Sequence, residues 1–267
     1  KAVAIGVDAL KTQDPATAGD TFNVAVGHSA GAAVSTGTQN TLIGGEAAKV
    51  LTGANNVMVG SQSGLISTSA DNNTFVGHDS GVTNTTGDGN TFIGESVRGS
   101  SATVSAEFAI GLNGQGQGAG TMAFVNAGAH TSVTVGQTTF SGSSDSRLKN
   151  NIATSTAGLS FINDLRPVTF EWKPVNQIPE TFNAYDAEST GRYNHNDKVN
   201  HGFVAQEVKT VIDAHSEIKN GHGLWSESPD GIEQLAPSAL VPMLVKAIQE
   251  LSAKNDALEA RIATLEG

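Results

Sequence analysis

The chain has no cysteine, so disulfide bonds cannot staple its fold and thiolate metal sites are excluded. Basic residues are scarce, with 15 Lys and Arg against 26 Asp and Glu, which gives a net charge of −11. A general nucleic-acid binder needs a basic excess, so we expect no nucleic-acid partner. The sequence also lacks an apolar run of about 18 residues, so we expect no membrane insertion. We expect neither a cofactor nor a bound metal.

Glycine and basic charge are unevenly distributed, which divides the chain near residue 143. Residues 1–143 hold 24 of the 31 glycines and four of the 15 basic residues, and residues 144–267 hold the rest. A length of 267 residues is long for one compact domain and suits two. Because the chain opens at Lys1 apparently inside a repeat, we expect an upstream part of the same chain.

A pattern of Asn, three mostly apolar residues and Gly recurs through the first half. Its glycines lie 17, 16, 17, 17 and 17 residues apart from Gly27 to Gly111. Each copy predicts a short strand ending at the glycine, in which the residue before Gly and the one two positions earlier share a face. Coils of this kind must stack to bury their apolar face. With only two or three inward apolar residues per strand, we expect three chains to share one axis.

Over about residues 1–111 the repeat resembles the β-roll and triple-β-helix repeats of phage tail fibres and of trimeric surface adhesin heads. Its Asn, Ser and Thr residues occupy turn positions, where we expect them to bond their own backbone. The first half has no pair of carboxylates at a spacing that would suggest catalysis. His28 and His78 follow equivalent glycines and could hold a metal or anion on a threefold axis, although exposed turn histidines are commoner. Residues 111–120 predict a flexible connector rather than a phosphate loop, and residues 121–140 predict the last strands.

Four motifs follow in order in the second half. The first is Ser144-Asp145-x-Arg147-Leu148-Lys149-x-x-Ile152, and the others span residues 170–173, 201–208 and 240–251. Together they resemble the endosialidase-type intramolecular chaperone domain, the S74 peptidase family, over about residues 144–267. Members of that family end phage tail spikes, tail fibres and neck appendages, and one occurs in the myelin regulatory factor. The last role needs a DNA-binding domain, which the acidic first half does not resemble.

The resemblance implies a Ser-Lys dyad carried by Ser144 and Lys149. A serine needs a base to take its proton, and a lysine is such a base only where desolvation lowers its pKa toward neutrality. Residues five apart point to opposite faces of a strand and lie roughly 140° apart around a helix. A tight turn must therefore fold the segment back, or Lys149 must act on another chain. The plain alternative is that Ser144-Asp145 caps a turn and Lys149 is solvated.

The cut is expected at a peptide bond of Ser144. We favour the bond between Ser143 and Ser144, through attack of Ser144 on the preceding carbonyl, over the bond between Ser144 and Asp145. Asp145 and Arg147 either orient the segment or pair with each other. His201 either orients a dyad partner, donates to an oxyanion, or is a structural histidine before a buried strand.

The remaining pattern predicts a helix over 156–165 with a Ser155 or Thr156 cap, strands over 168–172, 202–205 and 232–235, and a helix over 206–213. The resemblance implies that residues 174–200 form a protruding arm that grips the unfolded fibre, with a disordered loop as the alternative. Apolar residues alternate at spacings of four and three from Leu244 to Leu265, with Asn255 among them, which predicts a coiled coil. Ile at the a positions with Leu at the d positions generally favours a two-stranded coiled coil. The fibre repeats and the family resemblance favour a trimer instead.

The expected fold is a mainly β first half, a trimeric β-roll or triple β-helix, followed by an α+β chaperone domain that ends in a coiled-coil helix. The expected domains are a repeat fibre (1–120), terminal strands and junction (121–143), a chaperone (144–239) and a trimerisation coiled coil (240–267).

The expected function is that of the C-terminal part of a homotrimeric tail fibre or spike. Its chaperone domain promotes folding and then releases itself by one autoproteolytic cut, in cis or between chains. The expected partners are the upstream fibre of the same chain and a host cell-surface receptor, either glycan or protein. We expect it in a phage virion assembled in the host cytoplasm. The alternative is a bacterial trimeric adhesin at the cell surface, and a polysaccharide-degrading spike is disfavoured because a carboxylate pair is missing.

Overall fold

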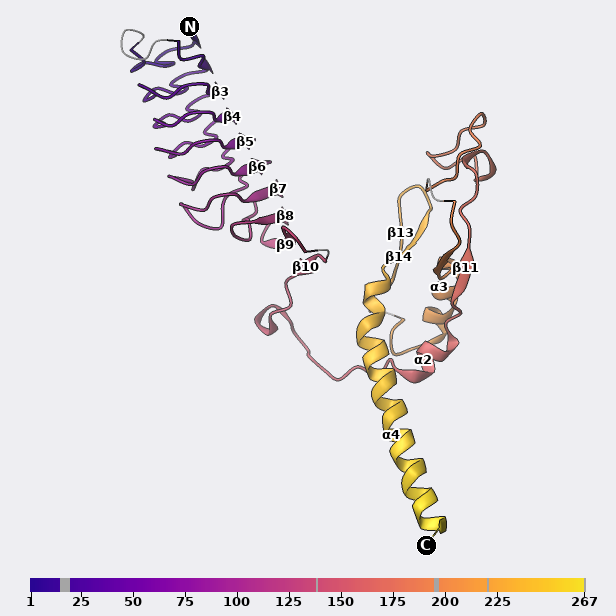
Figure 1. The fold of residues 1–267 in the computed structure, drawn as a ribbon. Coiled ribbons are helices and arrows are strands. Elements are labelled where there is room, and N and C mark those ends of the chain that lie inside the picture. The colour runs from indigo at the N-terminus through magenta and orange to yellow at the C-terminus, as the bar shows by residue number, and fades with distance from the viewer. Residues whose placement is uncertain (15–19, 138, 195–196, 220, 267) are drawn as a thin grey trace. The chain divides into compact units, whose positions relative to one another are not determined.

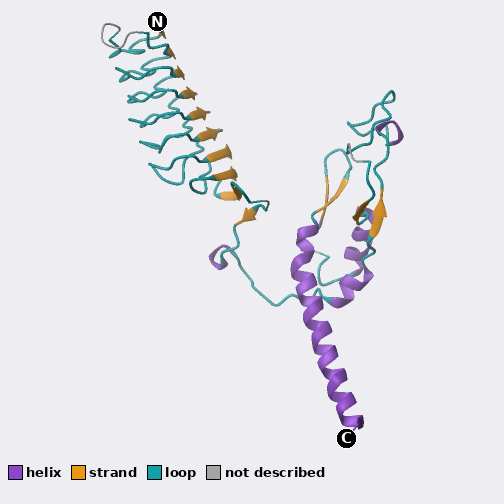
Figure 2. Cartoon of the chain, in the orientation of Figure 1, coloured by secondary structure: helices purple, strands orange, loops and turns teal. Residues whose placement is uncertain are grey.

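The computed structural model describes residues 1–14, 20–137, 139–194, 197–219 and 221–266, which form two compact units, Lys1–Asn150 and Asn151–Gly267. Each unit is described by itself (Figures 1 and 2). The predicted fold class, a β-solenoid followed by a mixed α/β region with a long final helix, is confirmed. The domain boundaries at 120, 143 and 239 stay predictions, and residues 15–19, 138, 195–196, 220 and 267 of those ranges lie outside the described residues.

The first unit is a solenoid in which each described coil contributes one short strand to a single sheet (Figure 1). The strands pair in parallel and in sequence order, with equivalent residues of successive coils aligned. Their bounds are β1 (Val3–Ile5), β2 (Val24–Val26), β3 (Thr41–Ile43), β4 (Val57–Val59), β5 (Thr74–Val76), β6 (Thr91–Ile93), β7 (Phe108–Leu112) and β8 (Thr121–Asn126). Two antiparallel strands, β9 (Ala129–Thr134) and β10 (Ser141–Gly142), end the sheet.

The core of the solenoid is filled by the inward residues of the strands from β2 onward, which in β2 to β6 are the middle residues, together with apolar residues of the turns such as Val34 and Leu51. Phe75 and Phe92 are fully buried there, and their rings stack with centroids 5.0 Å apart. The flanking residues, such as Thr74 and Val76, share the outer face and are partly exposed. The prediction that flanking residues share a face is therefore confirmed, but the prediction of two or three inward residues per strand is wrong for one chain. Because a strand alternates its faces, only the middle residue of three can point into the coil.

A ladder of buried asparagines joins successive coils. The side-chain oxygen of Asn56 accepts from the backbone N–H of Asn73 at 3.0 Å, and its nitrogen donates to the carbonyl of Ala70 at 2.8 Å. The same acceptor role is filled by Asn23, Asn40, Asn73 and Asn90. The prediction that these side chains bond their own turns is corrected, because the N–H groups that bond to their oxygens lie 16 or 17 residues away in the next coil. Buried backbone groups need such partners.

The stretch 111–120, predicted as a flexible connector, belongs to the last coil instead. Gln115 forms a parallel bridge with Arg98. The buried carboxylate of Glu107 accepts from the N–H of Gly118, and a Cβ atom on Gly116 would lie 2.4 Å from that carboxylate. The glycines therefore let the chain close tightly over Glu107, which ends the asparagine ladder.

The second unit combines short helices, two strand pairs and a long helix (Figure 2). Its elements are α2 (Leu159–Asp164), β11 (Val168–Phe170), β12 (Asn200–Gly202), α3 (Ala205–Ala214), β13 (Trp225–Glu227), β14 (Glu233–Leu235) and α4 (Val241–Glu266). β11 pairs with β12, and β13 pairs with β14, both antiparallel. Phe161, Ile212 and Leu224 are buried at the centre of the core. The core is therefore formed by α2, α3 and the loop before β13.

The first helix of this unit begins later than predicted and has a different cap. α2 starts at Leu159, and neither Ser155 nor Thr156 caps it. Instead, a carboxylate oxygen of Glu250 on α4 accepts from the N–H of Leu159 at 2.9 Å. A carboxylate at this position satisfies a free N–H and complements the helix dipole. The cap comes from another element, so no local pattern predicts it.

Other predicted elements are present with shifted bounds. The helix predicted over 206–213 is confirmed as α3, and the strand over 232–235 as β14. The strand predicted over 168–172 ends at Phe170. The strand predicted over 202–205 is wrong except at Gly202, because β12 ends there and Ala205 begins α3.

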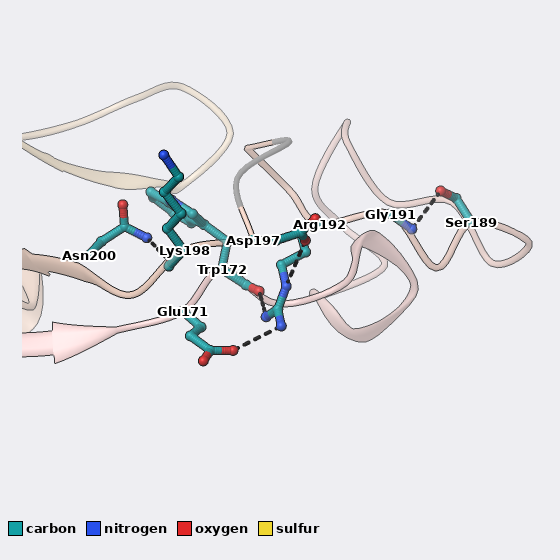
Figure 3. Close-up of polar contacts among 8 residues, drawn as sticks. All are labelled: Glu171, Trp172, Ser189, Gly191, Arg192, Asp197, Lys198 and Asn200. Carbon is teal, nitrogen blue, oxygen red and sulfur yellow. Dashed lines mark hydrogen bonds and ion pairs between the residues drawn. The ribbon is translucent and has the colours of Figure 1, made fainter.

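The predicted arm, residues 174–200, leaves the unit between β11 and β12 and is closed at its base. The N–H of Val175 donates to the carbonyl of Gly191 at 2.8 Å. Arg192 donates to the carbonyl of Trp172 at 2.6 Å and pairs with Glu171 at 2.8 Å (Figure 3). The described part of this segment is therefore held by defined contacts rather than being a disordered loop, and residues 195–196 lie outside the described residues.

The predicted C-terminal helix is confirmed as α4. Ala247 is buried against the rest of the unit. The predicted coiled-coil positions are exposed in the single chain, namely Leu244, Ile248, Leu251, Leu258, Ile262 and Leu265. Their pairing with other chains stays a prediction. Among the described residues, no helix combines the length and apolar character that crossing a membrane requires.

Candidate functional site

The segment that follows β10 folds back on itself in one tight turn. Residues 146–148 form a short 3-10 helix, and the carboxylate of Asp145 caps it by accepting from the N–H of Arg147 at 2.8 Å. The N–H of Lys149 closes the turn on the carbonyl of Ser146 at 3.1 Å. This turn meets the geometric requirement that the spacing of five residues imposes on Ser144 and Lys149.

Ser144 and Lys149 are in contact within one chain. The Nζ atom of Lys149 donates to the Oγ atom of Ser144 at 2.8 Å. Of the two routes expected from the sequence, a turn within the chain or a lysine from another chain, this geometry corresponds to the first. Both residues are exposed. A lysine accepts a proton from a serine only after water is removed from around it. A catalytic pair at this position would therefore have to be shielded from solvent by other protein atoms. The catalytic role itself stays a prediction.

Asp145 and Arg147 pair with each other. The guanidinium donates to both carboxylate oxygens, with Nε–Oδ1 at 3.0 Å and Nη2–Oδ2 at 2.6 Å. The side-chain hydrogen bonds from Arg147, and then its backbone N–H, lower the pKa of Asp145. An exposed pair adds little stability, so its main effect is to fix the shape of the turn.

Ser143, on the upstream side of the favoured cut, is held by the end of the solenoid. β10 pairs with β9 so that Ser141 lies opposite Ser132 and Gly142 opposite Thr131. The next residue, Ser143, has its Oγ atom 3.4 Å from Nδ1 of His130. His130 belongs to none of the sequence motifs. Only the pairing of β9 with β10 brings it to the junction.

His201, the other predicted site residue, lies in the second unit. It is exposed in β12, opposite Thr169, and its role stays a prediction. In the same motif Glu207 accepts from Nε of Arg166 at 2.9 Å, and the hydrogen bonds from Arg166 lower the pKa of Glu207. This pair fastens the first turn of α3 to the connection between α2 and β11.

Metal binding finds no support in the part of the chain that the structure describes. No group of three or more His, Asp or Glu side chains there could hold a metal ion. His28 is exposed, and His78 lies beside Asp79 at 3.4 Å. Their meeting on a threefold axis remains a prediction.

A second titratable cluster lies at the edge of the core of the second unit, where the buried His215 meets the exposed Asp164 and Glu217. Nδ1 of His215 is 2.8 Å from Glu217, and Nε2 is 2.9 Å from Asp164. The ring packs edge-on against Phe161, with centroids 5.4 Å apart. The hydrogen bond to Glu217, followed by that to Asp164, raises the pKa of His215 above its ordinary value of 6.5.

We expect the second unit to lose stability as pH rises through the raised pKa of His215. The folded state holds the proton more tightly than the unfolded state, so the contribution is complete below about pH 6.5 and is lost above the folded-state pKa. His215→Gln should therefore lower the melting temperature of the helical signal more at about pH 6 than at about pH 8.5. His28→Gln, at an exposed histidine, is the control. A loss of equal size at both pH values would contradict this account.

One family model matches part of the chain that follows the solenoid. Residues 144–217 match the family model Peptidase_S74, described as chaperone of endosialidase. This segment is a domain of that family, whose members are peptidases with autoproteolytic activity. The match begins at Ser144, the serine that contacts Lys149. No curated protein and no solved structure matches the chain.

Proposed function

We propose that this chain is the C-terminal part of a homotrimeric fibre whose S74-type domain acts as an intramolecular chaperone and then cuts itself off next to Ser144. One observation carries the proposal. The 2.8 Å contact from Lys149 Nζ to Ser144 Oγ lies at the first residue of the family match, two residues after the last strand of the solenoid ends at Gly142. A cut there separates the stem from the chaperone.

The chemistry proceeds in two balanced steps. Lys149 takes the hydroxyl proton of Ser144, and Oγ bonds to the carbonyl carbon of Ser143. The peptide C–N bond breaks as the nitrogen of Ser144 receives a proton from Lys149, which leaves an ester between Ser143 and the Ser144 side chain. Water then adds to the ester carbon, so that Ser143 gains a carboxylate and Ser144 regains its hydroxyl. The reaction consumes one water, needs no cofactor and occurs once per chain.

The outer face of the solenoid sheet supports assembly of three chains. It presents one β-branched residue per coil in register, namely Ile5, Val26, Ile43, Val59, Val76, Ile93 and Ile110. The other outward position of each strand is also uncharged, as at Val57 and Thr74. A continuous apolar face of this kind marks an interaction surface. Copies of the same chain around one axis would bury it and would also supply a cover for the exposed dyad.

The free face of α4 supports the same assembly. Its exposed seam runs from Leu244 to Leu265 at coiled-coil spacing. Asn255 lies in this seam and donates within its own helix to Glu259 at 2.8 Å. A buried Asn at such a position fixes the register of the helices at some cost in stability. We propose three helices rather than two because the solenoid face and the family both favour a trimer.

The arm supports the chaperone part of the proposal. At its base Trp172, Phe182 and Tyr193 line a largely apolar hollow of about 430 Å³. Arg192 contacts Glu171 and Trp172, which follow β11, and also Asp197, which precedes β12 (Figure 3). It therefore connects the two ends of the arm. A fixed apolar hollow suits the side chains that an unfolded fibre strand exposes.

We place the fibre in a phage virion, assembled in the host cytoplasm, with a host-surface glycan or protein as its receptor. Domains of this family occur in phage tail fibres and spikes, which favours that setting. The alternative is a bacterial surface adhesin, whose head repeats the solenoid also resembles.

The test is the intact mass of the full chain and of its Ser144→Ala and Lys149→Ala variants. We expect the wild type to yield residues 1–143 and 144–267, while both variants stay whole. Ser146→Ala and Lys254→Ala are matched controls and should be cut normally. A fragment boundary one residue later would instead assign the bond after Ser144. A wild type that stays whole as a folded trimer would refute the proposed self-cleavage. If residues 1–143 expressed without residues 144–267 are soluble, the proposed chaperone role is refuted.

A further inference from the structure

The solenoid ends in three adjacent antiparallel strands, β8, β9 and β10 (Figure 1). The last of them, β10, ends at Gly142, one residue before Ser143 and the favoured cut. His130 on β9 lies opposite Val125 on β8. Continuing the register of β9 with β10 by one residue places Ser143 opposite His130 on the other side. Residues directly opposite one another share a face of the sheet. Val125 is buried, so the half-buried His130 and the exposed Ser143 lie on the face that continues the solenoid interior.

We infer that His130 is a positioning residue for the cut, acting through its contact with the Ser143 hydroxyl. This inference rests on the proposed self-cleavage. The Ser143 Oγ–His130 Nδ1 distance of 3.4 Å tethers the residue whose carbonyl is attacked. On the other side of the bond, the turn closed by Asp145 and Lys149 presents the nucleophile. Reaction between two groups is fast only when both are held in the required geometry.

Because His130 belongs to β9, the folded end of the solenoid is part of the cleavage site. His130 reaches Ser143 only when the hairpin of β8 and β9 has formed and β10 has paired with it. A slip of one residue in that pairing would turn Ser143 to the opposite face. Cleavage is thereby coupled to completion of the last strands of the fibre. After the cut, β10 stays paired with β9, and the fibre ends at Ser143.

The test follows the rate at which the full chain is cut during refolding from denaturant, measured by intact mass. His130→Leu keeps bulk but removes the hydrogen bond, and should slow the cut roughly three- to tenfold, the value of one such bond. His130→Gln should restore most of the rate. Ser143→Ala should slow the cut as much as His130→Leu, and the double variant should be no slower than either one. Ser132→Ala, on the same strand but opposite Ser141, is the matched control.

The outcomes separate the inference from the function on which it rests. A wild type that is never cut overturns both. If the wild type is cut and His130→Leu is cut equally fast, only the inference is overturned. Additive losses from His130→Leu and Ser143→Ala would also overturn it, because they would show that the two residues act independently. Should His130→Leu fail to fold, Ser143→Thr, which keeps the hydroxyl, must still be cut faster than Ser143→Ala.

Discussion

Replacing Gly44 with alanine is expected to destabilise the solenoid severely. Gly44 ends β3 with φ of +135°, a conformation that alanine adopts only under strain, and an added Cβ atom would lie 2.3 Å from the carbonyl oxygen of Gly60. That oxygen belongs to the backbone of the next coil, so it cannot move without shifting the stack. Backbone strain and overpacking together cost about 2–6 kcal/mol per chain. The melting temperature of the β-sheet signal should fall by roughly 4–24 °C.

The neighbouring glycine provides the control. At Gly45 an added Cβ atom would have Ser61 Oγ as its nearest neighbour, at 3.9 Å, which is ordinary contact. Gly45→Ala should therefore leave the melting temperature within about 2 °C of the wild type. Both variants are compared at one protein concentration, because assembly makes the midpoint depend on concentration. Equal melting temperatures for Gly44→Ala and Gly45→Ala would show that the coils do not stack as described.

The second large effect is expected from Asn56→Ala in the asparagine ladder. The substitution leaves the N–H of Asn73 without its acceptor and the carbonyl of Ala70 without its donor, both inside the solenoid. Each buried polar group that loses its partner costs about 1–3 kcal/mol. The loss should therefore reach about 2–6 kcal/mol, seen as a lower melting temperature of the β-sheet signal.

An exposed residue of the same coil serves as the comparison for Asn56→Ala. The Ser61 hydroxyl donates at 3.4 Å to the carbonyl of Gly45 from an exposed position. Ser61→Ala should change stability by less than about 0.5 kcal/mol, as surface substitutions usually do. If Asn56→Ala costs no more than Ser61→Ala, the ladder does not hold the coils together.

The two glycines show how far the sequence could predict the fold. Gly44 recurs at the repeat period, and that regularity alone predicted the strands and their ends. The same pattern did not reveal that Leu42 points into the coil while Ile43 faces outward. Three-residue strands are too short for alternation to show which side is the core, and closure of the coil decides it. Asn56 was likewise assigned to its own turn, because its partners lie in a coil that the linear sequence does not place beside it.

The candidate site divides in the same way. Ser144 and Lys149 were predicted as a dyad because the motif that contains them resembles the opening of the S74 family. Whether they meet depended on the turn that Asp145 caps, and the structure brings them to 2.8 Å. His130 could not be identified from the sequence, because its proximity to Ser143 arises from strand pairing across 13 residues.

The sequence by itself therefore determined the repeat, the division of the chain, the terminal helix and the serine and lysine of the junction. These depend on periodicity and residue chemistry, which a linear pattern carries. Only the tertiary structure decided which face of each strand is buried, that Glu250 caps α2, and that the end of the stem reaches the residue before Ser144. Those contacts join segments that meet only when coils close, strands pair and helices pack.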